Sequence, residues 1–291
     1  MRLAILANPR SGRGRGGALA QELAARLRAR GHEVLEYTGV DRRDAMDWVH
    51  RVQPTVDRLA VVGGDGSLNA AATALRPPFP PVLLLPVGTA NLLARELGLP
   101  SIPEEAAALL EADRVQPLDL GHILERRTFL VWDFGLGGEL IRRFEEKRPD
   151  RIRKAQYLPL LGSLLKELRS LPPVHVHADG EDLGEFVYGV VSGVRTYATS
   201  WLHLGPAAYN DGWWEMYLFR RLSLPLILGT GLRAAFRRLH RSPHVLHRRT
   251  RAVRVEGASP SPVEVDGDYA GTTPVEFRLD GEALPLLVPP R

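Results

Sequence analysis

The sequence predicts a two-domain α/β protein, with a parallel-sheet domain over residues 1–120 and an antiparallel β-rich domain over residues 121–291. Strand-like and helix-like segments alternate through the first part, which is typical of a parallel sheet covered by helices. From about residue 115 strand patterns predominate, bounded by Gly, Pro and Asp. A chain of 291 residues also exceeds the usual size of a single domain, which favours a division into two.

The first domain is expected to contain four strands, each a short apolar run followed by a helical pattern: residues 3–7, 32–37, 58–62 and 82–85. Such runs are typical of parallel strands that are buried on both faces. After the first run, Leu19, Leu23 and Leu27 recur at helical spacing and Gly31 ends the helix. Prolines between residues 77 and 81 interrupt the chain before the fourth strand.

The second domain is expected to be mainly strands, at residues 174–177, 186–191, 213–219, 252–256, 262–265 and 274–279. Helical patterns occur at residues 136–146, 157–169 and 226–240. A ligand site in the cleft between the two domains is the default expectation for such a protein.

Composition narrows the possible functions. With 44% hydrophobic and 25% charged residues the chain resembles ordinary globular proteins, and the absence of cysteine excludes disulfides, zinc–thiolate sites and thiol nucleophiles. Neither a secretion signal nor an apolar run of about 18 residues is recognisable, so a cytoplasmic protein is expected. The net charge is +4, but no nucleic-acid reader motif accompanies the arginines, so no nucleic-acid partner is expected. The sequence carries no indication of oligomeric state.

Three glycine-rich turns follow the expected strands and point to phosphate binding. Glycine allows a backbone to approach a ligand closely, and the free amides at a helix start bind phosphate. Asp65, inside the second turn, has a carboxylate that can hold a metal ion or accept a proton. The alternative is that such turns bind nothing, and their spacing matches neither a dinucleotide nor a P-loop motif. The turns comprise Asn8, Pro9, Arg10, Ser11 and Gly12; Gly63, Gly64, Asp65, Gly66, Ser67, Leu68 and Asn69; and Gly88, Thr89, Ala90 and Asn91.

These motifs together resemble the diacylglycerol kinase catalytic-domain family, which includes bacterial lipid kinases, sphingosine kinases and ceramide kinases. Further matches in the same order are Leu97-Gly98-Leu99-Pro100, Tyr209-Asn210-Asp211-Gly212 and Val265-Asp266-Gly267-Asp268. The GGDG string also occurs in NAD kinases and phosphofructokinases, whereas the full set is specific. The resemblance implies a nucleotide-binding α/β domain, a C-terminal β-sandwich and an active site in the cleft between them.

The resemblance also implies an activity, namely Mg²⁺-assisted transfer of the ATP γ-phosphate to a lipid hydroxyl at the membrane surface. The first two turns would cradle the phosphates, and Thr38 and Thr89 would contact the nucleotide. Either Asp266 or Asp268 would take the proton of the acceptor hydroxyl, while Asp65 would hold Mg²⁺ or serve as the base itself. Asp211, with backbone carbonyls near Ala208 and Trp213, resembles a structural Mg²⁺ or Ca²⁺ site.

Two departures from the family pattern leave alternatives open. The family commonly has Asp where this chain has Leu92, and Glu where it has Asp268. Because catalytic geometry is sensitive to shifts of about 1 Å, a catalytically inactive nucleotide- or lipid-binding homologue is one alternative. A kinase of a soluble metabolite such as NAD is another, since it shares the GGDG chemistry.

Two further patterns bear on partners. Arginines crowd residues 233–254, and Leu228, Leu232, Phe236 and Leu239 form an apolar helical stripe in the same region. Such a helix can lie on an anionic membrane, which predicts peripheral membrane association, or it can pack on a core with its charged face in solvent. His175 and His177 alternate as a pair of metal ligands would, but with no recognisable third ligand they are interpreted as ordinary histidines.

Overall fold

The computed structural model describes residues 1–146 and 171–290, so the helix expected at 157–169 lies outside the described residues. The chain divides into two compact units. Unit 1 contains Met1–Leu120 together with Gly281–Arg291, and unit 2 contains Gly121–Asp280. The end of the chain thus belongs to unit 1, whereas the sequence analysis assigned it to the second domain.

Unit 1 is built on a parallel sheet. Its strands follow the order β2 (Glu33–Thr38), β1 (Arg2–Ala7), β3 (Arg58–Gly63) and β4 (Val82–Pro86). The end of β18 (Val275–Leu287) is parallel to β4, with Leu286 opposite Val82. The apolar runs form strands because they are buried on both faces, as Leu3, Ile5 and Val61 show.

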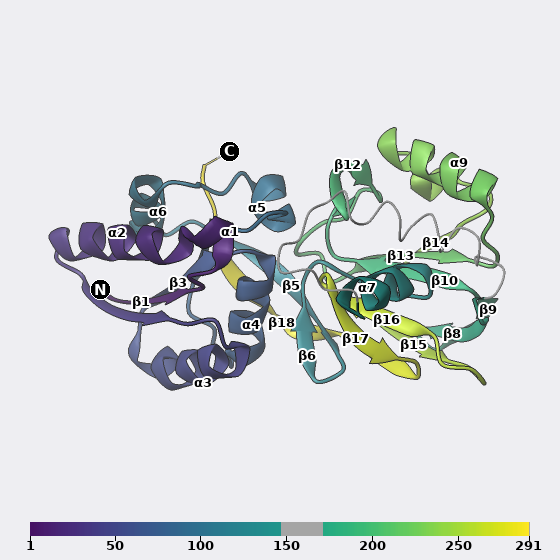
Figure 1. Cartoon of the computed structure of the whole chain (residues 1–291), viewed down its shortest axis with the longest axis horizontal. Coiled ribbons are helices and arrows are strands. Elements are labelled where there is room, and N and C mark those ends of the chain that lie inside the picture. Colours follow the sequence, from purple (N-terminus) through teal and green to yellow (C-terminus); the bar gives the residue numbers. More distant parts are fainter. Residues whose placement is uncertain (147–170, 291) are drawn as a thin grey trace. The chain divides into compact units, whose positions relative to one another are not determined.

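Helices cover both faces of this sheet (Figure 1). Helix α2 (Gly16–Ala29) and α6 (Pro103–Glu111) lie on one face, and α3 (Arg42–Val52) and α4 (Asp65–Ala74) lie on the other. Leu23 and Leu27 of α2 pack against Leu3 and Leu83 of the sheet, as their helical spacing predicts. Three shorter elements complete the unit: α1 (Ser11–Gly14), η1 (Gln53–Thr55) and α5 (Leu92–Leu97).

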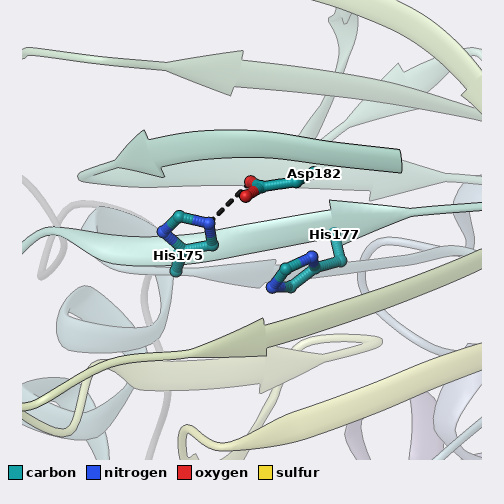
Figure 2. Close-up of side chains that lie close together, drawn as sticks. All are labelled: His175, His177 and Asp182. Atoms are coloured by element: carbon teal, nitrogen blue, oxygen red, sulfur yellow. Dashed lines mark hydrogen bonds and ion pairs between the residues drawn. The ribbon is translucent and has the colours of Figure 1, made fainter. Parts of the chain in front are cut away.

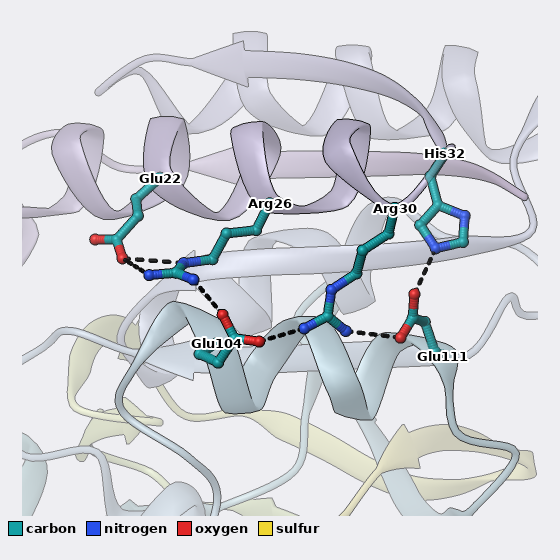
Figure 3. Close-up of polar contacts among 6 residues, drawn as sticks. All are labelled: Glu22, Arg26, Arg30, His32, Glu104 and Glu111. Atoms are coloured by element: carbon teal, nitrogen blue, oxygen red, sulfur yellow. Dashed lines mark hydrogen bonds and ion pairs between the residues drawn. The ribbon is translucent and has the colours of Figure 1, made fainter.

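A row of ion pairs connects α2 with α6 (Figure 3). Glu104 of α6 accepts from both Arg26 and Arg30 of α2, and Glu111 accepts from Arg30 at 2.7 Å. A hydrogen bond from His32 and the Arg30 guanidinium hold the pKa of the Glu111 carboxyl below its ordinary value. The side chains of Arg26, Arg30, Glu104 and Glu111 are 29–53% exposed, so solvent screens these pairs and they add little to the free energy of unfolding.

Unit 2 contains two main antiparallel sheets and a separate two-stranded one. The larger follows the order β14 (Leu246–Thr250), β13 (Trp214–Phe219), β10 (Tyr188–Ser192), β7 (Val131–Phe134), β16 (Pro262–Val265) and β17 (Asp268–Thr272). The other contains the first part of β18, β15 (Ala252–Glu256), β8 (Val174–Ala178) and β9 (Glu181–Phe186). Remaining elements are β5 (Val115–Ile123), which begins in unit 1, β6 (Arg126–Thr128), β11 (Thr196–Tyr197), β12 (Thr199–His203), α7 (Leu136–Glu146), α9 (Leu224–Ala235) and η4 (Leu239–Arg241).

A single apolar core joins the two sheets of unit 2 into a sandwich. It contains Trp132 and Trp214 from the larger sheet and Val176 and Phe277 from the other. The rings of Trp214 and Phe277 lie 4.9 Å apart across this core. The parallel and antiparallel architectures that the sequence predicts are therefore confirmed. In the part of the chain that the structure describes, no helix is both long and apolar enough to cross a bilayer.

Candidate functional site

The first glycine-rich turn follows β1 and is held against its two counterparts. The Asn8 amide donates to Val62 O at 3.1 Å, and Asn8 Oδ1 accepts from the Arg10 amide at 3.0 Å. Gly12 has a φ of +60°, which side chains disfavour, and a Cβ on it would lie 2.3 Å from the Val87 side chain. Only glycine therefore fits this contact with the third turn.

The second and third turns touch through their backbones. The Val87 amide donates to Gly63 O at 2.7 Å. A Cβ on Gly88 would lie 2.8 Å from the Gly64 Cα, too close for any side chain. Asn91 closes the third turn by donating from Nδ2 to Gly88 O at 2.8 Å. The structure thus brings the three turns together in unit 1.

Asp65 connects the second turn with the helix that follows the third. It is 9% exposed and begins α4, where the positive end of the helix dipole favours a carboxylate. Its Oδ2 accepts from the Leu92 amide at 2.8 Å. The position where the family commonly has an acid therefore contacts Asp65 through its backbone.

The remaining residues of these turns differ in how far their side chains are exposed to solvent. Leu68 is fully buried and Asn69 Oδ1 accepts from Arg42 at 2.6 Å, so both support the turn from inside. Thr38, the last residue of β2, is exposed beside the end of β1. Of the predicted set, Arg10, Thr38, Gly66 and Thr89 are exposed; Asn8, Pro9, Ser11, Gly12, Gly64, Ser67, Gly88 and Asn91 are partly buried; Gly63, Asp65, Leu68 and Asn69 are buried.

The strand order explains why the turns meet. From β1 the chain turns to one side to form β2 and then to the other side to form β3. Ligands of open α/β sheets bind at the carboxyl ends of the strands where this reversal occurs, and the first two turns flank that point. The exposed guanidinium groups of Arg10, Arg13 and Arg15 add positive charge there. The arrangement is suited to an anion with several charges, such as a nucleotide phosphate.

Substitution of Gly66 tests whether a ligand approaches this site. The position is exposed and a Cβ there would meet no heavy atom within 4 Å, so the fold does not require glycine. We expect Gly66→Ala to stabilise α4 by up to about 1 kcal/mol. We expect it to weaken ATP binding roughly 100-fold, because the methyl group intrudes where a phosphate must be placed to within about 1 Å. Calorimetry of unfolding and of ATP binding measures both effects.

Gly281→Ala is the matched control, since a Cβ on Gly281 also meets no heavy atom within 4 Å. ATP affinity should stay at the wild-type value in this variant. Equal ATP affinity in Gly66→Ala and wild type would contradict a phosphate contact at the second turn.

The acids of the C-terminal motif lie in unit 2 and differ in their surroundings. Asp266 Oδ1 accepts from Thr128 Oγ1 at 2.7 Å, from the Val131 amide at 3.0 Å and from the Leu130 amide at 3.1 Å. Asp268, at the start of β17, is exposed. The structure therefore gives Asp266 a role in holding the preceding loop and leaves the Asp268 carboxylate facing solvent.

A buried acid pair supports this motif from inside the sandwich. Burial and the neighbouring Asp133 raise the pKa of Glu264 well above its ordinary value, so Glu264 keeps its proton and shares it with Asp133. Asp133 also accepts from the Tyr197 hydroxyl at 2.7 Å and from the Gly138 amide at 2.8 Å. Glu264 accepts from the Gly267 amide. The Asp133–Glu264 pair therefore holds in place both the Gly267 backbone, between Asp266 and Asp268, and the Tyr197 hydroxyl.

Unit 2 also contains an open apolar cavity of about 260 Å³ that the sequence analysis did not identify. Helix α9 forms one wall through Ile227, Thr230 and Ala234, and the Tyr188 and Tyr197 side chains form another. These residues come from distant strands and helices without a common period, so no local pattern signals the cavity. Its volume is below the usual range of pockets for compact ligands, which favours a slender apolar group.

The loop that resembles a metal site contains competing positive charge. Asp211 pairs with Arg249 through Oδ2 and accepts from the Trp213 amide at 3.1 Å through Oδ1. The guanidinium groups of Arg249 and Arg251 both lie over the Trp213 ring, at 5.5 and 5.1 Å. A hard cation held by Asp211 and the carbonyls of Ala208 and Trp213 would have to displace Arg249. The metal role of these residues stays a prediction.

Comparison with known proteins finds a family model that matches the segment containing the three phosphate-type turns. Residues 2–123 match the family described as Diacylglycerol kinase catalytic domain. A diacylglycerol kinase of Mycobacterium tuberculosis is 29% identical over 299 residues, which cover 99% of this chain and 95% of the relative. A diacylglycerol kinase of Bacillus subtilis is 25% identical over 231 residues, which cover 76% of this chain and 74% of the relative.

A solved structure supports the fold over nearly the whole chain. The crystal structure of a diacylglycerol kinase from Bacillus anthracis superposes with a TM-score of 0.73 at 19% identity, covering 99% of this chain and 97% of that one. The fold that the sequence motifs imply is therefore confirmed, and the family model together with the curated relatives confirms the resemblance itself.

Proposed function

We propose that this protein is an ATP-dependent lipid kinase, because residues 2–123 match the model of the diacylglycerol kinase catalytic domain. The contact of three glycine-rich turns at the switch point of the unit 1 sheet carries the proposal. The acceptor is a lipid hydroxyl, as in a diacylglycerol, a sphingoid base or phosphatidylglycerol.

The residues of unit 1 fit ATP and a divalent cation. Gly12, Gly64 and Gly88 let the backbones of the three turns pack against one another, because a Cβ on Gly12 or Gly88 would collide with Val87 or Gly64. No side chain caps the start of α4, where backbone amides are suited to bind phosphate. The exposed guanidinium groups of Arg10, Arg13 and Arg15 are suited to neutralise the charge on phosphate oxygens. Asp65 offers the carboxylate for Mg²⁺, which supplies charge neutralisation on the transferring phosphoryl group.

The residues of unit 2 fit an acceptor and its base. In the proposed step the lipid hydroxyl oxygen bonds to the γ-phosphorus, the bond to the β–γ bridging oxygen breaks, and ADP leaves. We assign the hydroxyl proton to Asp268, because the Asp266 carboxylate already accepts from the loop of residues 128–131. The apolar cavity between α9 and the tyrosines is suited to part of an acyl chain.

Incubation with labelled ATP, Mg²⁺ and a lipid panel tests the proposal. The panel contains a diacylglycerol, a sphingoid base, ceramide and phosphatidylglycerol, with NAD as a soluble acceptor. Label in one of the lipids supports a lipid kinase and identifies its acceptor. Label in NAD alone would support the metabolite kinase. ATP binding without label in any acceptor would support the inactive homologue, which Leu92 and Asp268 favour; recovery of turnover in Leu92→Asp or Asp268→Glu would then identify the cause.

The assignment of the base gives a separate prediction. We expect Asp268→Asn to lower kcat about 10²–10⁴-fold, because the amide cannot take the hydroxyl proton. ATP affinity should be unchanged, since Asp268 holds no part of the phosphate cradle. Steady-state kinetics with the lipid found in the panel measures kcat, and Glu282→Gln serves as a control at another exposed acid. Wild-type kcat in Asp268→Asn would exclude Asp268 as the base.

A further inference from the structure

The outer face of the smaller sheet in unit 2 gathers two histidines and two carboxylates. On β8, Val174, Val176 and Ala178 point into the core, so His175 and His177 lie on the opposite face. In register, β15 brings Glu256 opposite His175, and β9 brings Asp182 opposite His177. The sheet geometry therefore collects these four side chains on one surface.

A β-bulge aims Asp182 at the histidines (Figure 2). The register of β8 and β9 shifts between Val176 and His177, and Gly184 has a φ of +83°. Bulges of this kind redirect a side chain. Asp182 Oδ1 thereby lies 2.6 Å from His175 Nε2, and one ligand atom each from His175, His177 and Asp182 lies within 4.8 Å of the others.

Glu256 lies outside this group of three but next to His177, which makes it the candidate for a fourth ligand. Its Oε1 lies 3.6 Å from His177 Nε2, while its Oε2 accepts from Arg254 at 2.6 Å. The Gly184 amide donates to Asp182 Oδ1 at 2.8 Å. Hydrogen bonds of this type orient ligands around metals.

We propose that His175, His177, Asp182 and Glu256 bind a late first-row divalent cation, with Zn²⁺ as the best match. Two neutral imidazoles and two carboxylates give a neutral Zn²⁺ site, and imidazole selects such metals over Mg²⁺ and Ca²⁺. Tetrahedral ligands of Zn²⁺ lie about 3.4 Å apart, so small side-chain rotations bring these atoms into place. All four side chains are between 35% and 59% exposed, which leaves the site open to the ion. A bound ion would connect β8, β9 and β15.

Titration of the chelator-treated full chain with Zn²⁺ in a calorimeter tests the site. We expect one ion per chain, and Co²⁺ in place of Zn²⁺ should give the visible absorption of a tetrahedral complex. Zn²⁺ should also raise the thermal midpoint of unfolding, because it binds the folded sheet. His175→Ala/His177→Ala should bind at least ~100-fold more weakly, beyond the usual effect of a lost orienting group.

Two further variants complete the test. Asp182→Asn keeps the shape of the side chain and the Gly184 hydrogen bond, so it removes only charge and should weaken Zn²⁺ binding about 10–100-fold. His50→Ala removes an exposed histidine of α3 and should bind like wild type. No saturable 1:1 binding by wild type, or wild-type affinity in both cluster variants, would overturn the site. None of these measurements depends on kinase turnover.

Discussion

Asp65→Asn is expected to lower the turnover of the proposed lipid kinase reaction about 10³-fold, the upper end of what removing one stabilising group at a transition state costs. The asparagine can still accept from the Leu92 amide through Oδ1, so the link between the second turn and α5 is kept. It loses the negative charge that would hold Mg²⁺ against the phosphates. Phosphorylation of the lipid found in the panel, with the thermal midpoint measured in parallel, separates lost chemistry from lost fold.

Asp41→Asn is the matched control, because Asp41 also accepts a backbone amide at a helix start in unit 1. It caps α3 through the Asp44 amide and lies outside the glycine-rich turns. Turnover in this variant should equal wild type, since asparagine is an equally good cap. Full turnover in Asp65→Asn would remove this carboxylate from the mechanism and with it the main chemical role of the second turn.

The architecture of both units could be predicted because local patterns and tertiary contacts agree. Residues 136–146 have a helical pattern and form α7 over that same range, and residues 262–265 form β16. The phosphate-type turns were recognisable because glycines gather in each of them along the sequence, although the contacts that require glycine at Gly12 and Gly88 come from neighbouring turns. Information that is local in the chain was enough for these features.

The strands that the sequence analysis missed depend on partners distant in the chain. β7 is buried along its whole length, and Asp133 within it conceals the apolar pattern. Asp133 is tolerated there because Glu264 and Tyr197, far along the chain, satisfy its oxygens. The strand expected at 186–191 corresponds to β10, whereas β9, which ends at Phe186 and belongs to the other sheet, was missed. The boundaries of such strands are determined by their pairing with other strands rather than by their amino-acid composition.

For the candidate site, too, local motifs could be predicted from the sequence, whereas contacts between distant residues could not. Asp266 and Asp268 were found from the sequence. That only Asp266 is held by a loop could not be predicted, because the amides that donate to it come from residues 130 and 131. His175 and His177 were recognised as a pair, while Asp182 was not connected to them because a β-bulge brings it into reach. Arg249, which competes for Asp211, arrives through the pairing of β13 with β14.

Helix α9 is expected to dock on anionic membranes. Leu228, Leu232 and Phe236 are 65%, 62% and 69% exposed, the highest values among the large hydrophobic side chains of the described residues. They follow one another at four-residue spacing on the face away from the cavity, while Ile227, Thr230 and Ala234 line it. A lipid kinase must meet an acceptor that stays in the bilayer. A helix with exposed leucines on one face and cavity-lining residues on the other is therefore suited to lie at the membrane surface.

Replacing Leu228, Leu232 and Phe236 by Ser should weaken sedimentation with anionic vesicles roughly 10³-fold, at about 1.5 kcal/mol for each apolar side chain withdrawn from the bilayer. Replacing Arg237, Arg238 and Arg241 by Gln should weaken it about 100-fold, since an arginine near an anionic surface contributes about 1 kcal/mol. Only the arginine contribution should fall with added salt, because charges are screened over about 8–10 Å at physiological ionic strength.

The control replaces Arg43, Arg51 and Arg114 by Gln, which removes the same charge from exposed positions of unit 1. This variant should bind vesicles almost as wild type does, because net charge alone then changes. In the α9 variants, turnover of a short-chain, water-soluble acceptor should barely change, since the exposed face of α9 does not line the cavity. Vesicle binding that is unaltered in both α9 variants would make the stripe an ordinary solvent-facing surface and require another route to the lipid. Loss of vesicle binding with soluble-acceptor turnover retained would separate the membrane contact of α9 from the chemistry of the phosphate-type turns.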